Sequence, residues 1–337
     1  LDIWADTYLG GVKPRTVKIY QDDIRLHIKP YLAAIRLDEL DTHTVQKFLN
    51  TLSSRGKKIP KRDEHGMTIK KDGKTVYDFA PLSPKTVKNV HGVLHGALRQ
   101  AVINRYIPLN PADGDFCKLP KIIKEEIHPF DEVQISAFLK AIEGNKFEVI
   151  FIVTLFTGLR EGEVLGLTWS CVDFERNTIT IDKQMQLHQE KDMIPYQLVS
   201  VKNSRSRVIA VAPFVMEQLK RHKVYQAEQR LRAGAMWQPS DLIFTNEVGD
   251  HITKSSLYRA FKKTAASIGR PDARFHDLRH SYAVAAIRSG DDIKTVQGNL
   301  GHATAAFTLD VYGHVTDEMK RDSASRMEAF IKKVSST

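Results

Sequence analysis

The first 120 residues place apolar side chains at helical spacing. Two stripes follow the i, i+3, i+4, i+7 pattern that puts side chains on one helix face: Val45, Phe48, Leu49 and Leu52, then Val87, Val90, Leu94, Ala97, Leu98 and Ala101. Asp41 or Thr42 is a suitable N-cap for the first helix, and Ser83-Pro84 for the second. A further helix is predicted over Arg15 to His27, ending before Pro30.

Residues 55–84 interrupt this helical pattern. They carry eight basic residues between Arg55 and Lys74. Thr68-Ile69 and Thr75-Val76-Tyr77 lie on either side of Asp72-Gly73, a signal for a β-hairpin. Two interpretations remain open for this insert, a basic hairpin that contacts a partner or a solvated loop.

Proline and glycine residues then break the pattern, and we place a linker at residues 114–128. Beyond Asp131 the pattern is mixed and mostly helical. The apolar residues 149–156 predict a buried helix that ends at Thr157-Gly158. Residues 178–181 predict a strand, and residues 198–201 and 207–211 predict a hairpin around Asn203-Ser204. Helices are expected again near Pro213, Ser255, Phe275 and Asp291, so the fold class is mostly α with small β elements.

Composition excludes several classes of protein. The 337 residues suit two domains, and 42% hydrophobic and 27% charged residues are ordinary for a globular protein. No stretch approaches the roughly 20 apolar residues of a membrane span. Two cysteines 54 residues apart, without a CxxC pair, favour neither a disulfide framework nor a zinc ribbon, and a cytoplasmic location is expected. Because the sequence begins at Leu1 rather than Met, we expect a fragment that lacks an N-terminal piece.

Charge points to a polyanionic partner. The net charge is +10, and residues 1–120 account for +7 of it. Lysine and arginine beside phosphates release counterions, so the front of the chain is the expected DNA clamp, although solubility alone also explains a basic balance. The DNA-binding candidates in and after the insert are Lys57, Lys58, Lys61, Arg62, Lys70, Lys71, Lys85 and Lys88.

Four segments carry candidate chemistry. Arg160 opens a helix after Gly158, where guanidinium and free backbone N–H groups suit a phosphate, although a salt-bridged surface arginine is the commoner outcome. Lys202 lies in the predicted hairpin turn and by itself suggests no more than a solvated lysine. His302 follows Leu300-Gly301, and Tyr312 follows ten residues later; taken singly, they suggest a helix cap and a partly buried helical residue.

The fourth segment is His276-Asp277-Leu278-Arg279-His280. His276 and Arg279 are i and i+3, so a helix places a proton acceptor and a fixed cation on one face. The string also approaches H-E-x-x-H, the signature of a zinc hydrolase. Asp277 is one methylene shorter than the glutamate of that signature, and no third ligand is evident, so we expect no metal.

The order of these residues along the chain is more informative than any one of them alone. Arg160, Lys202, His276, Arg279, His302 and Tyr312 occur in the sequence of the tyrosine recombinases, or phage-type integrases. The flanking words also resemble that family, above all the integrases of conjugative transposons: TGLREGEVLGL, VKNSRSRVIAV, FHDLRHSYA and LGHATAAFTLDVYGHV. The resemblance implies a helical core-binding domain (residues 1–113), a mixed α/β catalytic domain (129–315) and a helical tail (316–337). Gly298-Asn299 departs from an apolar family pattern and is expected to loosen the helix before His302.

The resemblance also implies a mechanism without cofactor. Arg160 and Arg279 would bind the nonbridging phosphate oxygens, and Tyr312 would attack the phosphorus. His276 would accept the tyrosine proton, and Lys202 would protonate the leaving 5′ oxygen. His302 would hydrogen-bond a phosphate oxygen, and Glu163 would orient Arg160 or His276.

The partners implied are double-stranded DNA with recombination sites and further copies of the chain, dimer to tetramer on DNA. A bending protein and an excision factor are further partners of this kind, in a bacterial cytoplasm. An apolar stripe in the tail, Met327, Phe330, Ile331 and Val334, would dock on a neighbouring subunit or on its own domain. A type IB topoisomerase, which shares this chemistry, and a non-catalytic DNA-binding protein with the same fold remain alternatives.

Overall fold

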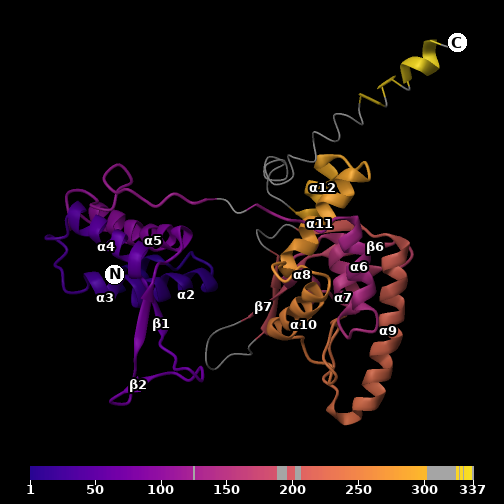
Figure 1. The fold of residues 1–337 in the computed structure, drawn as a ribbon, viewed down its shortest axis with the longest axis horizontal. Helices are drawn as coiled ribbons and strands as arrows, with labels where there is room; N and C mark the ends of the chain where they lie inside the picture. Colours follow the sequence, from indigo (N-terminus) through magenta and orange to yellow (C-terminus); the bar gives the residue numbers. More distant parts are fainter. Residues whose placement is uncertain are drawn as a thin grey trace. The chain divides into compact units, whose positions relative to one another are not determined.

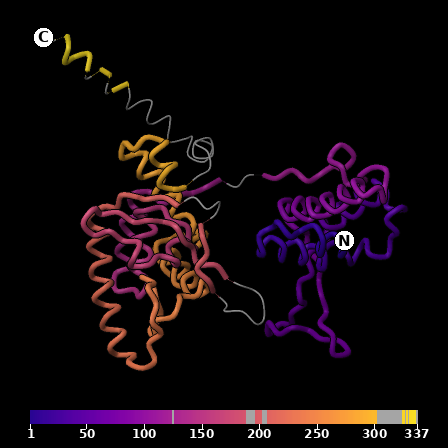
Figure 2. The backbone as a smooth tube through the Cα atoms, turned by 180° about the vertical axis from the view of Figure 1, so that it is seen from behind, coloured from indigo at the N-terminus to yellow at the C-terminus, as the bar shows by residue number. Residues whose placement is uncertain are grey.

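The chain divides into two compact units, residues 1–125 and 126–337, each with its own hydrophobic core. The computed structural model describes residues 1–123, 126–187, 196–201 and 206–301, and within the tail residues 324–325, 327–328 and 330–335. Figures 1 and 2 trace both units from opposite sides. Among the described residues, no helix is both long and apolar enough to cross a bilayer.

The first unit is helical around two stripes of apolar side chains. Its helices are α1 (Asp2–Tyr8), α2 (Pro14–Asp23), the π-helix η1 (Ile24–Ile28), α3 (Lys29–Leu32), α4 (Thr42–Arg55) and α5 (Pro84–Ile103). The stripes predicted for α4 and α5 are buried. Asp41 and Ser83 cap these helices by accepting the backbone N–H groups of Thr44 (2.8 Å) and Thr86 (3.1 Å). The predicted helices α4 and α5 are therefore confirmed.

The predicted end of a helix before Pro30 is wrong. Helix α2 passes into η1, and α3 continues through Pro30 to Leu32. The N–H of Lys29 bonds to the carbonyl of Ile24, five residues back, so the π-turn resets the hydrogen-bond register. Pro30 then lies in the first turn of α3, where a missing N–H is tolerated.

Between α4 and α5 the chain forms an antiparallel extension, residues 57–80, termed here the basic ribbon. Strand β1 (Lys57–Pro60) pairs with β4 (Tyr77–Ala80), and β2 (Lys70–Lys71) pairs with β3 (Lys74–Thr75). Asp72 and Gly73 take φ values of 51° and 74°, as the predicted hairpin turn requires. Figures 1 and 2 show the ribbon extending away from the helices of its own unit. The hairpin at 68–77 is confirmed, while the longer β1–β4 pairing was not predicted.

The second unit packs helices around α7 and small sheets. It contains α6 (Glu132–Ile142), α7 (Glu148–Thr157), α8 (Glu161–Leu165), η2 (Trp169–Cys171), α9 (Pro213–Ala233), η4 (Gly234–Met236), α10 (Lys254–Ser267), α11 (Phe275–Arg288) and α12 (Ile293–Leu300). Seven of the ten residues of α7 are buried, as its apolar run predicted. Phe138, Phe151, Phe261 and Phe275 form one aromatic cluster that joins α6, α7, α10 and α11. Helix α9 runs along one side of this unit (Figure 1).

The hairpin predicted around Asn203-Ser204 is wrong. Strand β8 (Tyr196–Ser200) pairs with β7 (Lys183–Leu187), whereas β9 (Arg207–Ala210) joins the sheet β5 (Val172–Asp173), β6 (Thr178–Ile181) and β9. Pairing β6 with β9 places the buried Ile179 opposite the buried Ile209, a contact that a β8–β9 hairpin would lose. Strand β7 is mostly polar with one buried residue, Met185, so its pattern gave little signal.

Gly158 allows a stability test of the α7 terminus. It takes φ 66°, and an added Cβ would lie 2.6 Å from Leu300 Cδ2 and against the ring of Tyr282. We expect Gly158→Ala to lower the free energy of unfolding by about 3 kcal/mol, because strain and overpacking add. Gly144→Ala is the matched control, since Gly144 has φ 70° and no atom within 4 Å of such a Cβ. It should cost about 1 kcal/mol. Urea denaturation of both variants measures this, and equal losses would contradict the packing argument.

Candidate active site

The chain turns sharply where α7 meets α8. Gly158 ends α7 in the left-handed conformation, which lets the backbone leave the helix at once. Arg160 follows in an extended conformation as the N-cap of α8. Its side chain is 34% exposed, so the guanidinium remains accessible to a ligand from solvent.

Glu163 holds Arg160 in this place. Its Oε2 accepts the backbone N–H of Arg160 at 3.0 Å, and its Oε1 accepts Nη1 of Arg160 at 2.7 Å. Burial raises the pKa of Glu163, but the hydrogen bond and charge of Arg207, with the charge of Arg160, outweigh it and lower the pKa to about 2. The carboxylate is therefore ionised at neutral pH, and its bonds in the described part of the chain go to these two arginines.

Arg207 is a residue of this site that the sequence analysis did not select. It begins β9, and its side chain is 12% exposed. Its Nη2 lies 2.7 Å from Glu163 Oε2 and its Nη1 lies 3.2 Å from Glu163 Oε1. The available signal was weak: an arginine five positions after Lys202, in a strand with alternating polarity.

Arginines converge on the last carbonyl groups of α12. These carbonyls have no partner within the helix and lie at the negative end of its dipole. The bonds run from Arg207 Nε to Asn299 O (2.8 Å), from Arg279 Nη2 to Leu300 O (2.6 Å) and from Arg160 Nη2 to Gly301 O (3.0 Å). The helix continues through Gly298-Asn299, and the Asn299 amide donates to the Tyr282 hydroxyl at 3.0 Å. The expected loosening of this helix is not observed.

Helix α11 carries His276 and Arg279. Arg279 is 1% exposed, and its Nη1 also donates to the Gly158 carbonyl at 2.6 Å, which ties α11 to the ends of α7 and α12. His276 lies at the surface of the site. Desolvation by the surrounding protein, together with the positive charge of Arg279, lowers the pKa of His276 to about 4. The imidazole is therefore neutral near pH 7 and can accept a proton.

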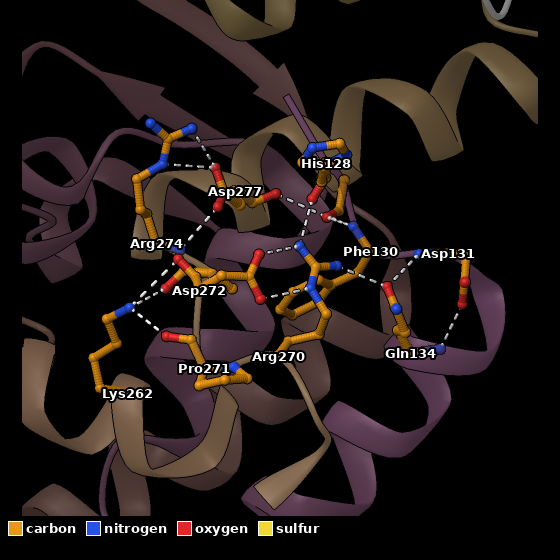
Figure 3. Close-up of polar contacts among 12 residues, drawn as sticks. His128, Phe130, Asp131, Gln134, Lys262, Arg270, Pro271, Asp272, Arg274 and Asp277 are labelled. Atoms are coloured by element: carbon orange, nitrogen blue, oxygen red, sulfur yellow. Dashed lines mark hydrogen bonds and ion pairs between the residues drawn. The ribbon is translucent and has the colours of Figure 1, made fainter. Parts of the chain in front are cut away.

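A polar cluster fixes the N-terminus of α11 (Figure 3). Asp277 accepts the backbone N–H of Arg274 at 2.8 Å and its guanidinium at 3.1 Å, which caps the helix. Arg270 donates to Gln134 Oε1 and to the His128 carbonyl, both at 3.0 Å.

These bonds of Arg270 attach residues 128–134, at the start of the second unit, to the loop before α11. The Arg270 guanidinium lies 5.2 Å from the centre of the Phe130 ring. The backbone N–H of Phe130 in turn donates to Ser281 Oγ on α11 at 2.8 Å. The first residues of the unit are therefore part of the support of α11.

The structure brings together Arg160, Glu163, His276 and Arg279 from the sequence-predicted set. Lys202, His302 and Tyr312 lie outside the described residues. His302 directly follows Gly301, whose carbonyl Arg160 contacts. Among the described residues, no group of three or more His, Cys, Asp or Glu is arranged to hold a metal.

A cluster of arginines beside a neutral histidine can stabilise the charge of a phosphodiester, and the fold around it is a helical unit followed by a mixed α/β unit. The chain belongs to the phage integrase family, whose model matches residues 129–319. The model of the phage integrase N-terminal SAM-like domain matches residues 1–53. The protein is a tyrosine-type site-specific DNA recombinase.

Individual relatives agree with this assignment. The "Tyrosine recombinase XerC-like" of Caldanaerobacter subterraneus subsp. tengcongensis is 28% identical, over 94% of this chain and 78% of the relative. The ICEBs1 integrase of Bacillus subtilis is 27% identical, over 73% and 66%. The Tn1549 transposon integrase, solved with a circular intermediate DNA, has a TM-score of 0.74 at 20% identity and covers 97% of this chain and 98% of its own. That likeness shows the same fold in both units.

His280, next to His276, makes folding depend on pH. Burial, and then repulsion from His276 when that ring is protonated, lower the pKa of His280 to about 4, whereas an unfolded histidine takes up its proton near pH 6.5. The stability present above pH ~6.5 is therefore lost as pH falls toward 4, by about 1.4 kcal/mol per pH unit for each such proton. We expect His280→Gln to reduce this slope, measured by urea denaturation from pH 4 to 7. His65→Gln, at an exposed position of the basic ribbon, is the control, and an unchanged slope in His280→Gln would contradict the prediction.

Proposed function

We propose that the protein is the integrase of a mobile genetic element and that it cuts DNA through a 3′-phosphotyrosine bond to Tyr312. The observation that carries the proposal is the convergence of Arg160 and Arg279 on adjacent carbonyls at the end of α12. This convergence puts two guanidinium groups beside His276 and at the start of the segment that continues to His302 and Tyr312. The order of these residues along the chain supports the same assignment.

The chemistry follows from charge and proton balance. Arg160 and Arg279 stabilise the negative charge that grows on the nonbridging oxygens as the Tyr312 oxygen attacks phosphorus. A free tyrosine has a pKa near 10, so it needs a base at neutral pH, and the neutral His276 provides one. Lys202 protonates the departing 5′ oxygen, and His302 hydrogen-bonds a phosphate oxygen. The new phosphotyrosine bond replaces the phosphodiester bond, so a DNA hydroxyl reverses the step without ATP.

The basic ribbon is proposed as a DNA contact. Residues paired across an antiparallel ladder share a face, so Lys58 and Phe79 lie together, followed by Pro60 and Tyr77. Lysines at the β2–β3 turn are exposed as well. Cationic and aromatic side chains on an exposed ribbon suit phosphates and the sugar edges beside them. Lys57, Lys61, Arg62, Lys70, Lys71, Lys85 and Lys88 complete the proposed contact set.

We also propose that the protein assembles on DNA as a dimer to tetramer in a bacterial cytoplasm, with a core-binding domain up to residue 113, a linker at 114–128 and a catalytic domain to residue 315. A bending protein and an excision factor are proposed further partners.

The tail stripe Met327, Phe330, Ile331 and Val334 is exposed along its described residues, which suits docking on a neighbouring subunit. An unchanged synapse after removal of residues 327–337 would contradict that role.

The covalent step is tested with a nicked suicide duplex that carries the recombination site. We expect a denaturant-resistant protein–DNA adduct with the wild-type chain, in the presence of chelator, and none with Tyr312→Phe, because phenylalanine has no oxygen nucleophile. Binding of both proteins to the same DNA is the control. An adduct that persists in Tyr312→Phe would contradict the assignment, and its absence in the wild type would favour a non-catalytic DNA-binding protein.

The products separate the recombinase from a type IB topoisomerase. Joint DNA molecules are expected of a recombinase, whereas relaxation of supercoiled DNA alone is expected of a topoisomerase.

The ribbon contact predicts a change in salt dependence. If Lys70 and Lys71 each neutralise a phosphate, replacing both with glutamine makes the negative slope of log K against log salt less steep by about 1.8. Titration of DNA binding over a series of salt concentrations measures that slope. A double variant at the exposed Lys140 and Lys146 of the second unit is the matched control. Equal slopes for the ribbon variant and the wild type would exclude the ribbon from the DNA interface.

A further inference from the structure

Arg207 joins parts of the site that are distant in sequence. Its guanidinium contacts Glu163, 44 residues earlier, through two bonds, and the carbonyl of Asn299, 92 residues later, through Nε. The side chain is 12% exposed and that of Glu163 is 3% exposed, so both groups are shielded from water. The phosphate chemistry proposed above assigns no step to Arg207.

Through Glu163, Arg207 affects Arg160. The carboxylate accepts both the backbone N–H and the Nη1 of Arg160, so its position determines where that guanidinium lies. A carboxylate bonded to Arg160 alone could rotate about its side-chain torsions. The paired bonds from Arg207, one to each oxygen, remove that freedom because the arginine fork matches the carboxylate in one plane.

Through Asn299, Arg207 affects the end of α12. Its Nε bond holds the carbonyl one residue before Leu300 and two before Gly301, the residues contacted by Arg279 and Arg160. The guanidinium also packs against Gly301, where an added Cβ would lie 3.0 Å from Nη1. Gly301 takes φ 63°, and the chain continues from it directly to His302.

We propose that Arg207 is a positioning residue for strand cleavage, which sets Arg160 through Glu163 and sets the start of the His302–Tyr312 segment through the end of α12. This inference rests on the proposed function of that segment. Arg207 also begins the strand that starts five positions after Lys202, so the same side chain anchors the chain on the C-terminal side of the residue proposed as the acid.

A simpler role would be neutralisation of the Glu163 charge. Lysine distinguishes the two, because it keeps the positive charge but cannot direct a planar fork at Glu163 and a third donor at Asn299. If only charge matters, Arg207→Lys behaves like the wild type. If the geometry matters, the variant binds DNA but cleaves it slowly.

The main experiment compares Arg207→Lys with Arg176→Lys, a control at an 84% exposed side chain in the same sheet region. With the suicide duplex, we expect the rate of adduct formation to fall about 100-fold in Arg207→Lys, the size of effect that a misplaced catalytic group produces. DNA affinity and the Arg176→Lys rate should stay close to wild type. Hydrogen exchange at the backbone amides of Arg160 and Gly301 should become faster in Arg207→Lys alone, with or without DNA.

A second pair of variants separates charge from geometry. Arg207→Gln removes the largest of the contacts that lower the pKa of the buried Glu163, while those of Arg160 remain, so this pKa rises and adduct formation should decline further at acidic pH. Adding Glu163→Gln removes that acid-dependent decline. The rate should nevertheless stay low, because neither variant restores the bond to Asn299.

The outcomes are distinguishable. A wild-type adduct rate in Arg207→Lys, unchanged amide exchange, or full recovery in the Arg207→Gln, Glu163→Gln double variant would each overturn the positioning role. Absence of any adduct with the wild-type chain on bound DNA would instead contradict the proposed function, while the exchange measurement would still decide whether Arg207 orders Arg160 and Gly301.

Discussion

A buried guanidinium that joins the ends of two helices organises the second unit. Arg279 donates to the carbonyls of Gly158 and Leu300, the places where α7 and α12 stop. Carbonyls at a helix terminus have lost their helical partners and carry partial negative charge, so a permanent cation both satisfies and attracts them. Because Arg279 belongs to α11, three helices meet at one side chain, and Arg160 and His276 are set relative to that point.

The charges around this point are balanced unequally. Within the described part of the chain, Arg160 and Arg207 bond the buried carboxylate of Glu163, Arg279 bonds backbone carbonyls, and His276 stays neutral. The surplus positive charge suits the binding of an anion from solvent. The carboxylate of Glu163 holds the arginines in place and takes no part in the reaction. Arg160 is held by Glu163 and the Gly301 carbonyl while its side chain stays 34% exposed, so little rearrangement of this guanidinium is needed when the phosphodiester binds. Arg279, which is 1% exposed, adds a fixed positive charge from within the protein.

Local signals in the sequence predicted local structure well. The stripes of α4 and α5, the caps at Asp41 and Ser83 and the stop at Gly158 depend on neighbours within a few residues. The β8–β9 hairpin failed because strand partners are chosen by burial across the sheet, where Ile209 faces Ile179. Arg207 escaped notice for the same reason, since its partners Glu163 and Asn299 are distant in sequence. Arg160, His276 and Arg279 were selected from their order along the chain, and the contact between Arg160 and the end of α12 needed the fold.

The attachment of Phe130 to Ser281 has a consequence for the design of chimeras between recombinases. Residues 128–134 contact α11 and the loop before it through Phe130, the His128 carbonyl and Gln134. They therefore belong to the scaffold of the second unit, although they lie before α6 or in its first turn. A front unit taken from a relative should therefore be joined on the N-terminal side of His128. A junction placed later would replace the side chains that anchor α11, and an exchange meant to alter DNA choice would alter the reaction as well.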